Sequence, residues 1–403
     1  MPARLPPALR HRDYRNYATA QLLSNAGTQM QQVAVVWQLY VFTRSPLALG
    51  ILGFFRIAPI LLFALGGGVV ADAFDRRRLM IFTQSTLAVV SAVLAVTTAL
   101  GVGSPPLLYA LAAVAGTAVA FDAPARHSLV PALVPPEDLS SAMSVGFTGW
   151  QVASVAGPAI AGVLLAWKGP VLIFTVDAIS FLAVIAVLLT MSHRGAARPE
   201  TQVGLEAVKE GIRFVRRQPV IRTTMLLDFF GTFFGGSLLL MPIFANELLH
   251  VGPRGLGVLY AAQPAGAALA GIFLATRSLP PAQGKLILWA VAIYGAAVAV
   301  FGASRSFPVS LLALAISGAA DTVSTVIRQT LRNLLTPDAL RGRMTSLNMM
   351  FFMGGPQLGE VEAGAVARAF GPRISVASGG LLCVAVAAVT AAISPALRRY
   401  RRG

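Results

Sequence analysis

Long apolar segments alternate with short polar ones along almost the whole chain. Because about 20 apolar residues are needed for one membrane crossing, the pattern predicts twelve transmembrane helices, with few polar residues inside most of them. They span 17–42, 47–71, 79–100, 106–125, 142–166, 170–191, 222–246, 254–276, 286–303, 307–327, 344–367 and 372–394. Only helices and closed barrels satisfy the backbone in lipid, and segments of this length indicate an all-α membrane protein.

Composition agrees with this assignment. Apolar residues make up 56% of the chain and the mean hydropathy is +0.72, whereas a soluble domain has about 45–50% apolar residues. The net charge of +16 lies in short clusters between apolar segments, so we expect the lipid bilayer and not nucleic acid as the partner. The four histidines show no ligand spacing and no catalytic constellation is visible. We therefore expect no metal, no cofactor and no enzymatic activity.

The distribution of Lys and Arg predicts the orientation of the helices. Twenty-five of the 32 basic residues fall in the segments that share a side with both termini, and six fall in the segments on the other side. Lys and Arg collect on the cytoplasmic side of membrane proteins. Both termini are therefore expected in the cytoplasm.

The chain divides near its middle. Residues 192–221 form the longest polar segment and contain an amphipathic helical pattern over 205–217, typical of a helix in the membrane interface or of a soluble linker helix. The motif that begins Pro136-Glu-Asp-Leu recurs 201 residues later as Pro337-Asp-Ala-Leu. We therefore predict two pseudo-symmetric halves of six helices, 1–191 and 222–403, joined by 192–221.

A charged turn between the second and third apolar segments carries the first family signal. Gly68, Asp72, Arg76 and Arg77 follow the spacing Gly-x-x-x-Asp-x-x-x-Arg-Arg. This spacing resembles the loop between the second and third helices of the major facilitator superfamily, although Asp75 stands where that family usually has a second glycine. The resemblance implies the twelve-helix major facilitator fold, with a substrate site between the two halves.

Two further motifs refine the resemblance. Gly157, Pro158 and Gly162 in the fifth predicted helix look like the end of the glycine-proline signature of proton-coupled exporters, and small residues there permit close packing, expected against the eighth helix. The stretch that begins Phe121-Asp122-x-Pro124-Ala125-Arg126 is similar to the subfamily that includes enterobactin exporters and macrolide efflux proteins.

This resemblance implies a function. We expect a monomeric secondary transporter of the bacterial inner membrane that exports an amphiphilic small molecule, of drug, macrolide or siderophore type, by proton antiport with alternating access. A lipid or lysolipid flippase on the same fold and a non-transporting membrane sensor or scaffold are the alternatives. A scaffold has no reason to keep acids within the membrane, and the longest loop leaves no room for a large soluble domain.

Charges within the membrane need an explanation, because each costs roughly 3 kcal/mol to insert. We expect Asp122 to pair with Arg76 or Arg77 in an inner gate that also includes Gly68, Asp72 and Arg126, with proton binding by Asp122 as the alternative. Asp321 is expected near Arg328 at the equivalent place in the tenth helix. Asp177 is interpreted as a helix-start or packing residue.

Three acids are candidates for proton coupling. Asp228 lies in the seventh helix with no basic residue nearby on its face, and a buried carboxyl without a partner is suited to exchange a proton. The alternative for Asp228 is a hydrogen bond to a backbone or hydroxyl group. Glu360 and Glu362 in the eleventh helix are the next candidates.

Polar side chains near the middle of the membrane are the candidates for the substrate cavity. A water-filled central cavity that binds an amphiphile needs a few such groups among apolar ones. The alternative for each residue is a hydrogen bond between two helices. The candidates are Gln29, Gln32, Arg56, Trp150, Gln151, Gln263 and Gln357.

Overall fold

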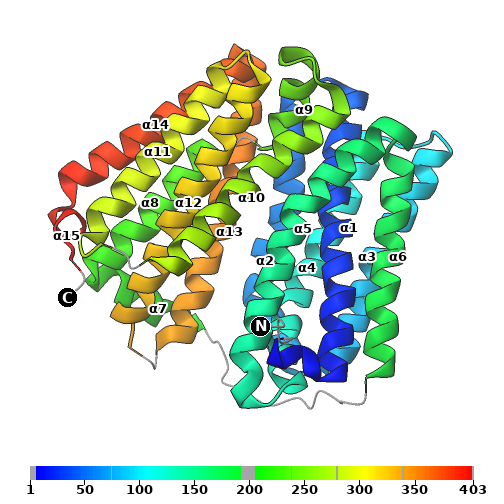
Figure 1. The fold of residues 1–403 in the computed structure, drawn as a ribbon, viewed down its shortest axis with the longest axis horizontal. Coiled ribbons are helices and arrows are strands. Elements are labelled where there is room, and N and C mark those ends of the chain that lie inside the picture. The colour runs from blue at the N-terminus through cyan, green and yellow to red at the C-terminus, as the bar shows by residue number, and fades with distance from the viewer. Residues whose placement is uncertain are drawn as a thin grey trace, which may run out of the picture. The chain divides into compact units, whose positions relative to one another are not determined.

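In the computed structural model, all the described elements are helices (Figure 1). The structure describes residues 6–73, 75–191, 205–236, 238–277, 280–337 and 340–401. For 64–73 and some other helical positions, mainly in 205–211 and 341–353, it describes the backbone alone. The chain forms two compact units, Met1–Phe42 with Phe55–Gln202, and Thr43–Phe54 with Val203–Gly403. The second unit therefore includes Thr43–Phe54, which contains the first turns of the second long helix. The predicted division into the halves 1–191 and 222–403 stays a prediction.

The first half of the chain contains six long helices. They are α1 (Arg12–Thr43), α2 (Pro46–Ala73), α3 (Arg76–Ala99), α4 (Pro105–Leu133), α5 (Leu139–Lys168) and α6 (Pro170–Thr190). Asp75 begins α3 as its N-cap, because its side chain accepts a hydrogen bond of 3.0 Å from the backbone N–H of Arg78. Such a cap satisfies one of the free N–H groups of the first turn.

The second half repeats this arrangement after a short amphipathic helix, α7 (Leu205–Arg217), which lies where the sequence predicts it. The long helices are α8 (Pro219–Gly235), α10 (Gly252–Thr276), α11 (Gln283–Ala303), α12 (Phe307–Leu335), α13 (Arg341–Phe370) and α14 (Pro372–Ile393). Short helical turns, η3 (Leu238–Leu240), α9 (Met241–Ile243) and the π-helical η4 (Phe244–Leu248), extend α8. A last turn, α15 (Pro395–Arg398), follows α14.

Ten helical segments in the described part are long and apolar enough to cross a membrane. The helices α1 and α13 are also long, with 32 and 30 residues, but their polar side chains lower their hydropathy. The all-α fold is therefore confirmed, and each predicted span has a corresponding helix. The main differences are at α4 and α12, which end at Leu133 and Leu335, about two turns beyond the predicted ends, because Arg126 and Arg328 continue the helix and do not end it.

Corresponding helices pack together in the two units. In the first unit α3 packs on α6 and α4, and in the second α11 packs on α14 and α12 (Figure 1). The turns before α6 and α14 also correspond: Gly169 and Gly371 have φ of 70° and 90°, and a proline begins the next helix. Glycine adopts such positive φ values without steric cost, which explains the repeated Gly-Pro pair.

Candidate functional site

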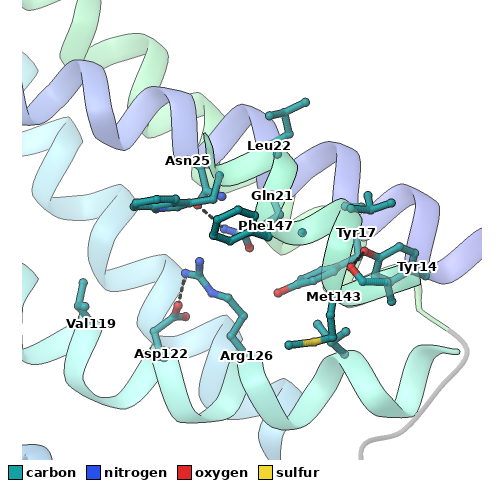
Figure 2. A pocket seen from close by; sticks show the side chains of 18 residues that line it. Tyr14, Tyr17, Gln21, Leu22, Asn25, Val119, Asp122, Arg126, Met143 and Phe147 are labelled. Atoms are coloured by element: carbon teal, nitrogen blue, oxygen red, sulfur yellow. Dashed lines mark hydrogen bonds and ion pairs between the residues drawn. The ribbon is translucent and has the colours of Figure 1, made fainter. Parts of the chain in front are cut away.

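A cavity of about 410 Å³ lies within the first unit, between α1, α4 and α5 (Figure 2). Its walls combine aromatic rings, apolar side chains and a few polar groups. The lining residues are Tyr14, Tyr17, Ala18, Gln21, Leu22, Asn25, Val119, Asp122, Ala123, Arg126, Val130, Ala142, Met143, Val145, Gly146, Phe147, Gly149 and Trp150. This volume and lining are typical of pockets for small molecules.

Helical periodicity places these side chains on facing surfaces. Residues three or four apart share one face of a helix, and Tyr14, Tyr17, Gln21 and Asn25 follow this spacing along α1. Met143, Phe147 and Trp150 do the same on α5. In Figure 2 the Arg126 side chain extends from α4 toward α1, between these two rows.

The charged centre of the cavity is an ion pair between Asp122 and Arg126, one turn apart on α4. Asp122 is 2% exposed and also accepts hydrogen bonds from Thr83 Oγ1 at 2.7 Å and Gln84 Nε2 at 2.9 Å, both on α3. These donors compensate the cost of burying a carboxylate. Asp122 thus pairs within its own helix in this structure, and its predicted pairing with Arg76 or Arg77 stays a prediction.

Arg77 has a different role. Its guanidinium donates hydrogen bonds to the carbonyl oxygens of Leu189 at 2.6 Å and Met191 at 3.2 Å. The last carbonyls of a helix lack partners within it, so Arg77 ties the start of α3 to the end of α6. Arg76 is half-buried. At Gly68 and Asp72 the structure describes the backbone alone, and their place in a gate stays a prediction.

Three polar atoms at the cavity have no hydrogen-bond partner among the described residues, although all are buried. They are the Tyr17 hydroxyl, Gln21 Oε1 and Arg126 Nε. Buried polar groups normally have partners, because an unmade hydrogen bond costs about 1–3 kcal/mol. The three atoms are therefore available to a polar group of a ligand.

Of the residues predicted for the substrate cavity, one lines this cavity, and the place of the others in a central cavity stays a prediction. Trp150 lines the cavity, whereas Gln29, Gln32, Arg56 and Gln151 belong to the same half of the chain and do not. Gln263 and Gln357 are half-buried on α10 and α13 in the second half. Hydropathy alone cannot tell which face of a helix a glutamine occupies, so these residues were selected by depth and not by direction.

Sequence reasoning also missed lining residues. Tyr14, Gln21, Asn25, Met143 and Phe147 were not selected. Tyr14 lies outside the predicted first span, because α1 begins five residues earlier, at Arg12, whereas the other four lie inside predicted spans. The usable signal was the regular spacing of Tyr14, Tyr17, Gln21 and Asn25, a polar and aromatic stripe in a helix that is otherwise apolar. Asp122 and Arg126 were selected, but for a gate.

The glycine-proline motif packs against α1. Gly157, Pro158 and Gly162 are buried in α5. A methyl group at Gly157 would lie 2.7 Å from Cβ of Gln29 and 3.0 Å from the carbonyl oxygen of Ala26. The close approach of α5 to α1 thus depends on glycine. The expected packing of this motif on the eighth helix stays a prediction.

Replacing Gly157 by alanine is expected to lower the free energy of unfolding by about 1–3 kcal/mol, the usual cost of overpacking. Thermal unfolding of the purified protein in detergent measures this. Gly146→Ala on the same helix is the matched control, because a methyl group there meets nothing within 4 Å. Equal melting temperatures for the two variants would contradict the tight α1–α5 contact.

A second charged cluster lies in the second unit. Asp228 on α8 is 7% exposed, and its Oδ1 lies 2.6 Å from Arg328 Nη2 on α12. The contact is an ion pair and not an aligned hydrogen bond. Arg328 Nη2 is also 4.0 Å from Asp321, as expected from the sequence, and its guanidinium donates to Ser324 and Thr325.

This cluster corrects the interpretation of Asp228. The sequence identifies it as a buried acid without a partner, but Arg328, 100 positions later, supplies the opposite charge. A tertiary contact of this kind has no local signal in the sequence. Glu360 and Glu362, the other coupling candidates, are half-buried on α13.

Solved structures of membrane transporters share this fold. A transporter of the POT family in complex with a thioalcohol-conjugated peptide has a TM-score of 0.76 at 12% identity, with 96% of each chain covered. A bacterial homologue of the human lysosomal transporter Spinster, inward-facing and occupied, has a TM-score of 0.72 at 16% identity, again with 96% of each covered. These likenesses show that the chain has the fold of these membrane transporters.

The comparison of sequences narrows the class. A model of the transmembrane secretion effector family matches residues 4–399, and the chain belongs to that family. The enterobactin exporter EntS of Citrobacter koseri is 24% identical over 392 residues, which cover 97% of this chain and 94% of that protein. The resemblance to the major facilitator superfamily and to its enterobactin-exporter subfamily is confirmed.

Proposed function

We propose that this protein exports an amphiphilic small molecule across the bacterial cytoplasmic membrane by proton antiport with alternating access, with both termini in the cytoplasm. The observation that carries the proposal is the cavity of the first unit. Its aromatic and apolar walls suit the apolar part of such a molecule. Its three unpartnered polar atoms, on Tyr17, Gln21 and Arg126, suit a hydrogen-bonding part.

The chemistry of the cavity favours a substrate with an aromatic ring and an acceptor oxygen. Four aromatic rings, those of Tyr14, Tyr17, Phe147 and Trp150, line it, and aromatic groups pack favourably on one another. The Arg126 guanidinium and the Tyr17 hydroxyl are donors. While Arg126 pairs with Asp122, its Nε–H has no hydrogen-bond partner in the part of the chain that the structure describes. Export of enterobactin by a relative that aligns over nearly the whole chain supports this direction of transport.

The remaining features of the proposal rest on the sequence. The excess of Lys and Arg supports cytoplasmic termini. We retain Gly68, Asp72, Arg76 and Arg77 as an inner gate on the strength of the family spacing, with Asp122 and Arg126 joined to it through α3. The protein is proposed to act as a monomer, with the bilayer and its substrate as partners.

Transport into inverted membrane vesicles with an acidic interior tests the proposal. Labelled enterobactin and labelled erythromycin are the two probes, and accumulation that collapses with the pH gradient is the expected result for at least one. Uptake that is independent of the pH gradient would contradict antiport. If a labelled lysophospholipid is transported and neither of the two probes is, the result would favour a flippase.

The cavity itself is tested by variants of its polar atoms. We expect Tyr17→Phe to weaken binding of the transported probe roughly 2- to 10-fold and Arg126→Gln roughly 10- to 150-fold, as expected for neutral and charged hydrogen bonds. Probe binding is measured by quenching of tryptophan fluorescence, to which Trp150 contributes from the cavity wall. Because the Tyr17 hydroxyl has no hydrogen-bond partner among the described residues, Tyr17→Phe should leave the melting temperature of the free protein unchanged.

A matched pair of tryptophan variants supplies the control. Trp150 lines the cavity, whereas Trp167 lies near the other end of α5, 68% exposed and outside the cavity. Trp150→Phe should remove most of the quenching and Trp167→Phe should not. Equal loss in the two variants would place the binding site elsewhere.

A further inference from the structure

Asp177 is a fully buried acid that the proposed cavity does not use. It is the eighth residue of α6 and is 0% exposed. Its Oδ2 accepts a hydrogen bond of 2.8 Å from the Ser91 hydroxyl on α3. Its Oδ1 has no hydrogen-bond partner in the described part of the chain and faces Gly27 on α1, where an added methyl group would lie 2.6 Å away. The helices α1, α3 and α6 lie side by side in Figure 1.

Among the residues that the structure describes, no cation balances this acid. Asp122 is paired with Arg126 and Asp228 with Arg328, but no basic side chain of the described residues lies within 4.0 Å of Asp177. The charged residues of α1 and α3 lie in their first turns, and that of α5 is Lys168 at its last residue. From the helices packed around Asp177, the groups that face it are Ser91 and Gly27, with Ser180 one turn along α6.

An ionised carboxylate in this position would be uncompensated within the membrane. Its burial would cost several kcal/mol, whereas the neutral acid needs only hydrogen bonds. The surroundings therefore favour an Asp177 that holds a proton.

Ser91 is placed to serve both protonation states. Its hydroxyl oxygen accepts a hydrogen bond of 2.7 Å from Gln31 Nε2 on α1. Its proton can reach either the carbonyl oxygen of Leu87 at 3.0 Å or Asp177 Oδ2 at 2.8 Å. When Asp177 is neutral, its own proton can be donated to Ser91, which then donates to Leu87. When Asp177 is ionised, Ser91 turns its proton to the carboxylate.

Packing alone does not require a carboxyl group here. The eighth residue of α14, the corresponding helix of the second half, is Gly379. A methyl group there would lie 2.3 Å from the carbonyl oxygen of Phe234 on α8. The two helices of this crossing therefore pack closely in both halves. A glycine permits the close packing in each case: Gly379 on α14 in the second half and Gly27 on α1 in the first. The first half thus has an acid at the position where the second half has a glycine.

We propose that Asp177 is the group that takes up and releases the coupling proton, with Ser91 as its hydrogen-bond partner in both states and Gln31 holding Ser91 in place. This inference rests on the proposed antiport and assigns its proton site. Gln31 is half-buried, so the hydrogen-bonded chain leads from the buried acid toward the surface of α1.

The test compares Asp177→Asn with the wild type in the inverted vesicles described above, with enterobactin and erythromycin as probes. We expect Asp177→Asn to lose gradient-driven accumulation at least 10-fold and to retain downhill exchange, because the amide still accepts from Ser91 but does not titrate. Glu137→Gln, an exposed acid of the same unit, is the matched control and should accumulate the probe normally. Uphill transport by Asp177→Asn at the wild-type level would overturn the proposal.

An infrared measurement separates this proposal from the proposed function. The carbonyl stretching band of a protonated carboxyl group should be present in the wild type, absent in Asp177→Asn and shifted in frequency in Ser91→Ala, which removes one hydrogen bond. Ser91→Ala should also move the midpoint of the pH dependence of transport. If the wild type shows no gradient-driven transport, antiport itself fails. If antiport holds and the band survives in Asp177→Asn, the proton site lies elsewhere.

Discussion

Replacing Asp122 by alanine is expected to abolish transport and to lower the free energy of unfolding by about 3–5 kcal/mol, the usual cost of breaking a buried ion pair from one side. The change leaves Arg126 without its counter-charge in the cavity. It also removes the acceptor for Thr83 on α3, which bonds Asp122 at 2.7 Å. Transport in inverted vesicles and thermal unfolding in detergent measure the two effects.

Two further variants separate the contributions at this site. Asp122→Asn retains an acceptor for Thr83 and Gln84 and removes the charge, so its loss of stability should be smaller than that of Asp122→Ala. Adding Arg126→Gln to Asp122→Asn should cost less than the sum of the single changes, because the groups form one network. Full transport by Asp122→Ala would remove the pair from the mechanism.

Replacing Asp228 by asparagine is expected to have the second largest effect, and the effect should fall on stability. Arg328 is 6% exposed, and Asp228 is its nearest carboxylate, at 2.6 Å against 4.0 Å for Asp321. Loss of that charge leaves a buried guanidinium poorly compensated, at about 3–5 kcal/mol. A lower melting temperature is therefore expected for Asp228→Asn, together with reduced amounts of protein in the membrane.

The double variant Asp228→Asn with Arg328→Gln provides the control. A neutral pair of hydrogen-bonding side chains leaves no isolated charge, so the double variant should recover most of the stability lost in Asp228→Asn. If Asp228→Asn instead keeps the wild-type melting temperature and loses only gradient-driven transport, Asp228 is the coupling acid. That result would contradict the role that we assign to Asp177.

The helices could be read from the sequence almost completely. The apolar segments match helices in all twelve cases, and the amphipathic pattern at 205–217 matches α7. This success has a local cause: hydrocarbon thickness sets the length of a span, and the residues of one segment suffice to show it. The ends were harder to locate, as at α4 and α12, where a charged residue inside a helix looks like a boundary.

The roles of the buried acids could not be read in the same way. Asp122, Asp177 and Asp228 look alike in the sequence, since each lies in an apolar segment. Their roles were assigned from the family resemblance, the position in the span or the neighbouring residues. The structure pairs Asp122 within its own helix and Asp228 with a residue 100 positions away, and no cation of the described residues pairs with Asp177. The sequence thus identified Asp228 as the acid without a counter-charge, whereas among the described residues that acid is Asp177.

The sequence by itself determined the class of the protein, the approximate position of its long helices, and the residues whose charge is costly in a membrane. Those properties depend on length, hydropathy and local spacing. The tertiary structure decided which charges meet, which face of α1 lines the cavity and which acid stands alone. Each depends on how one helix is rotated about its axis relative to its neighbours. Successive residues of a helix point about 100° apart, so a residue that faces the cavity is followed by one that packs against another helix.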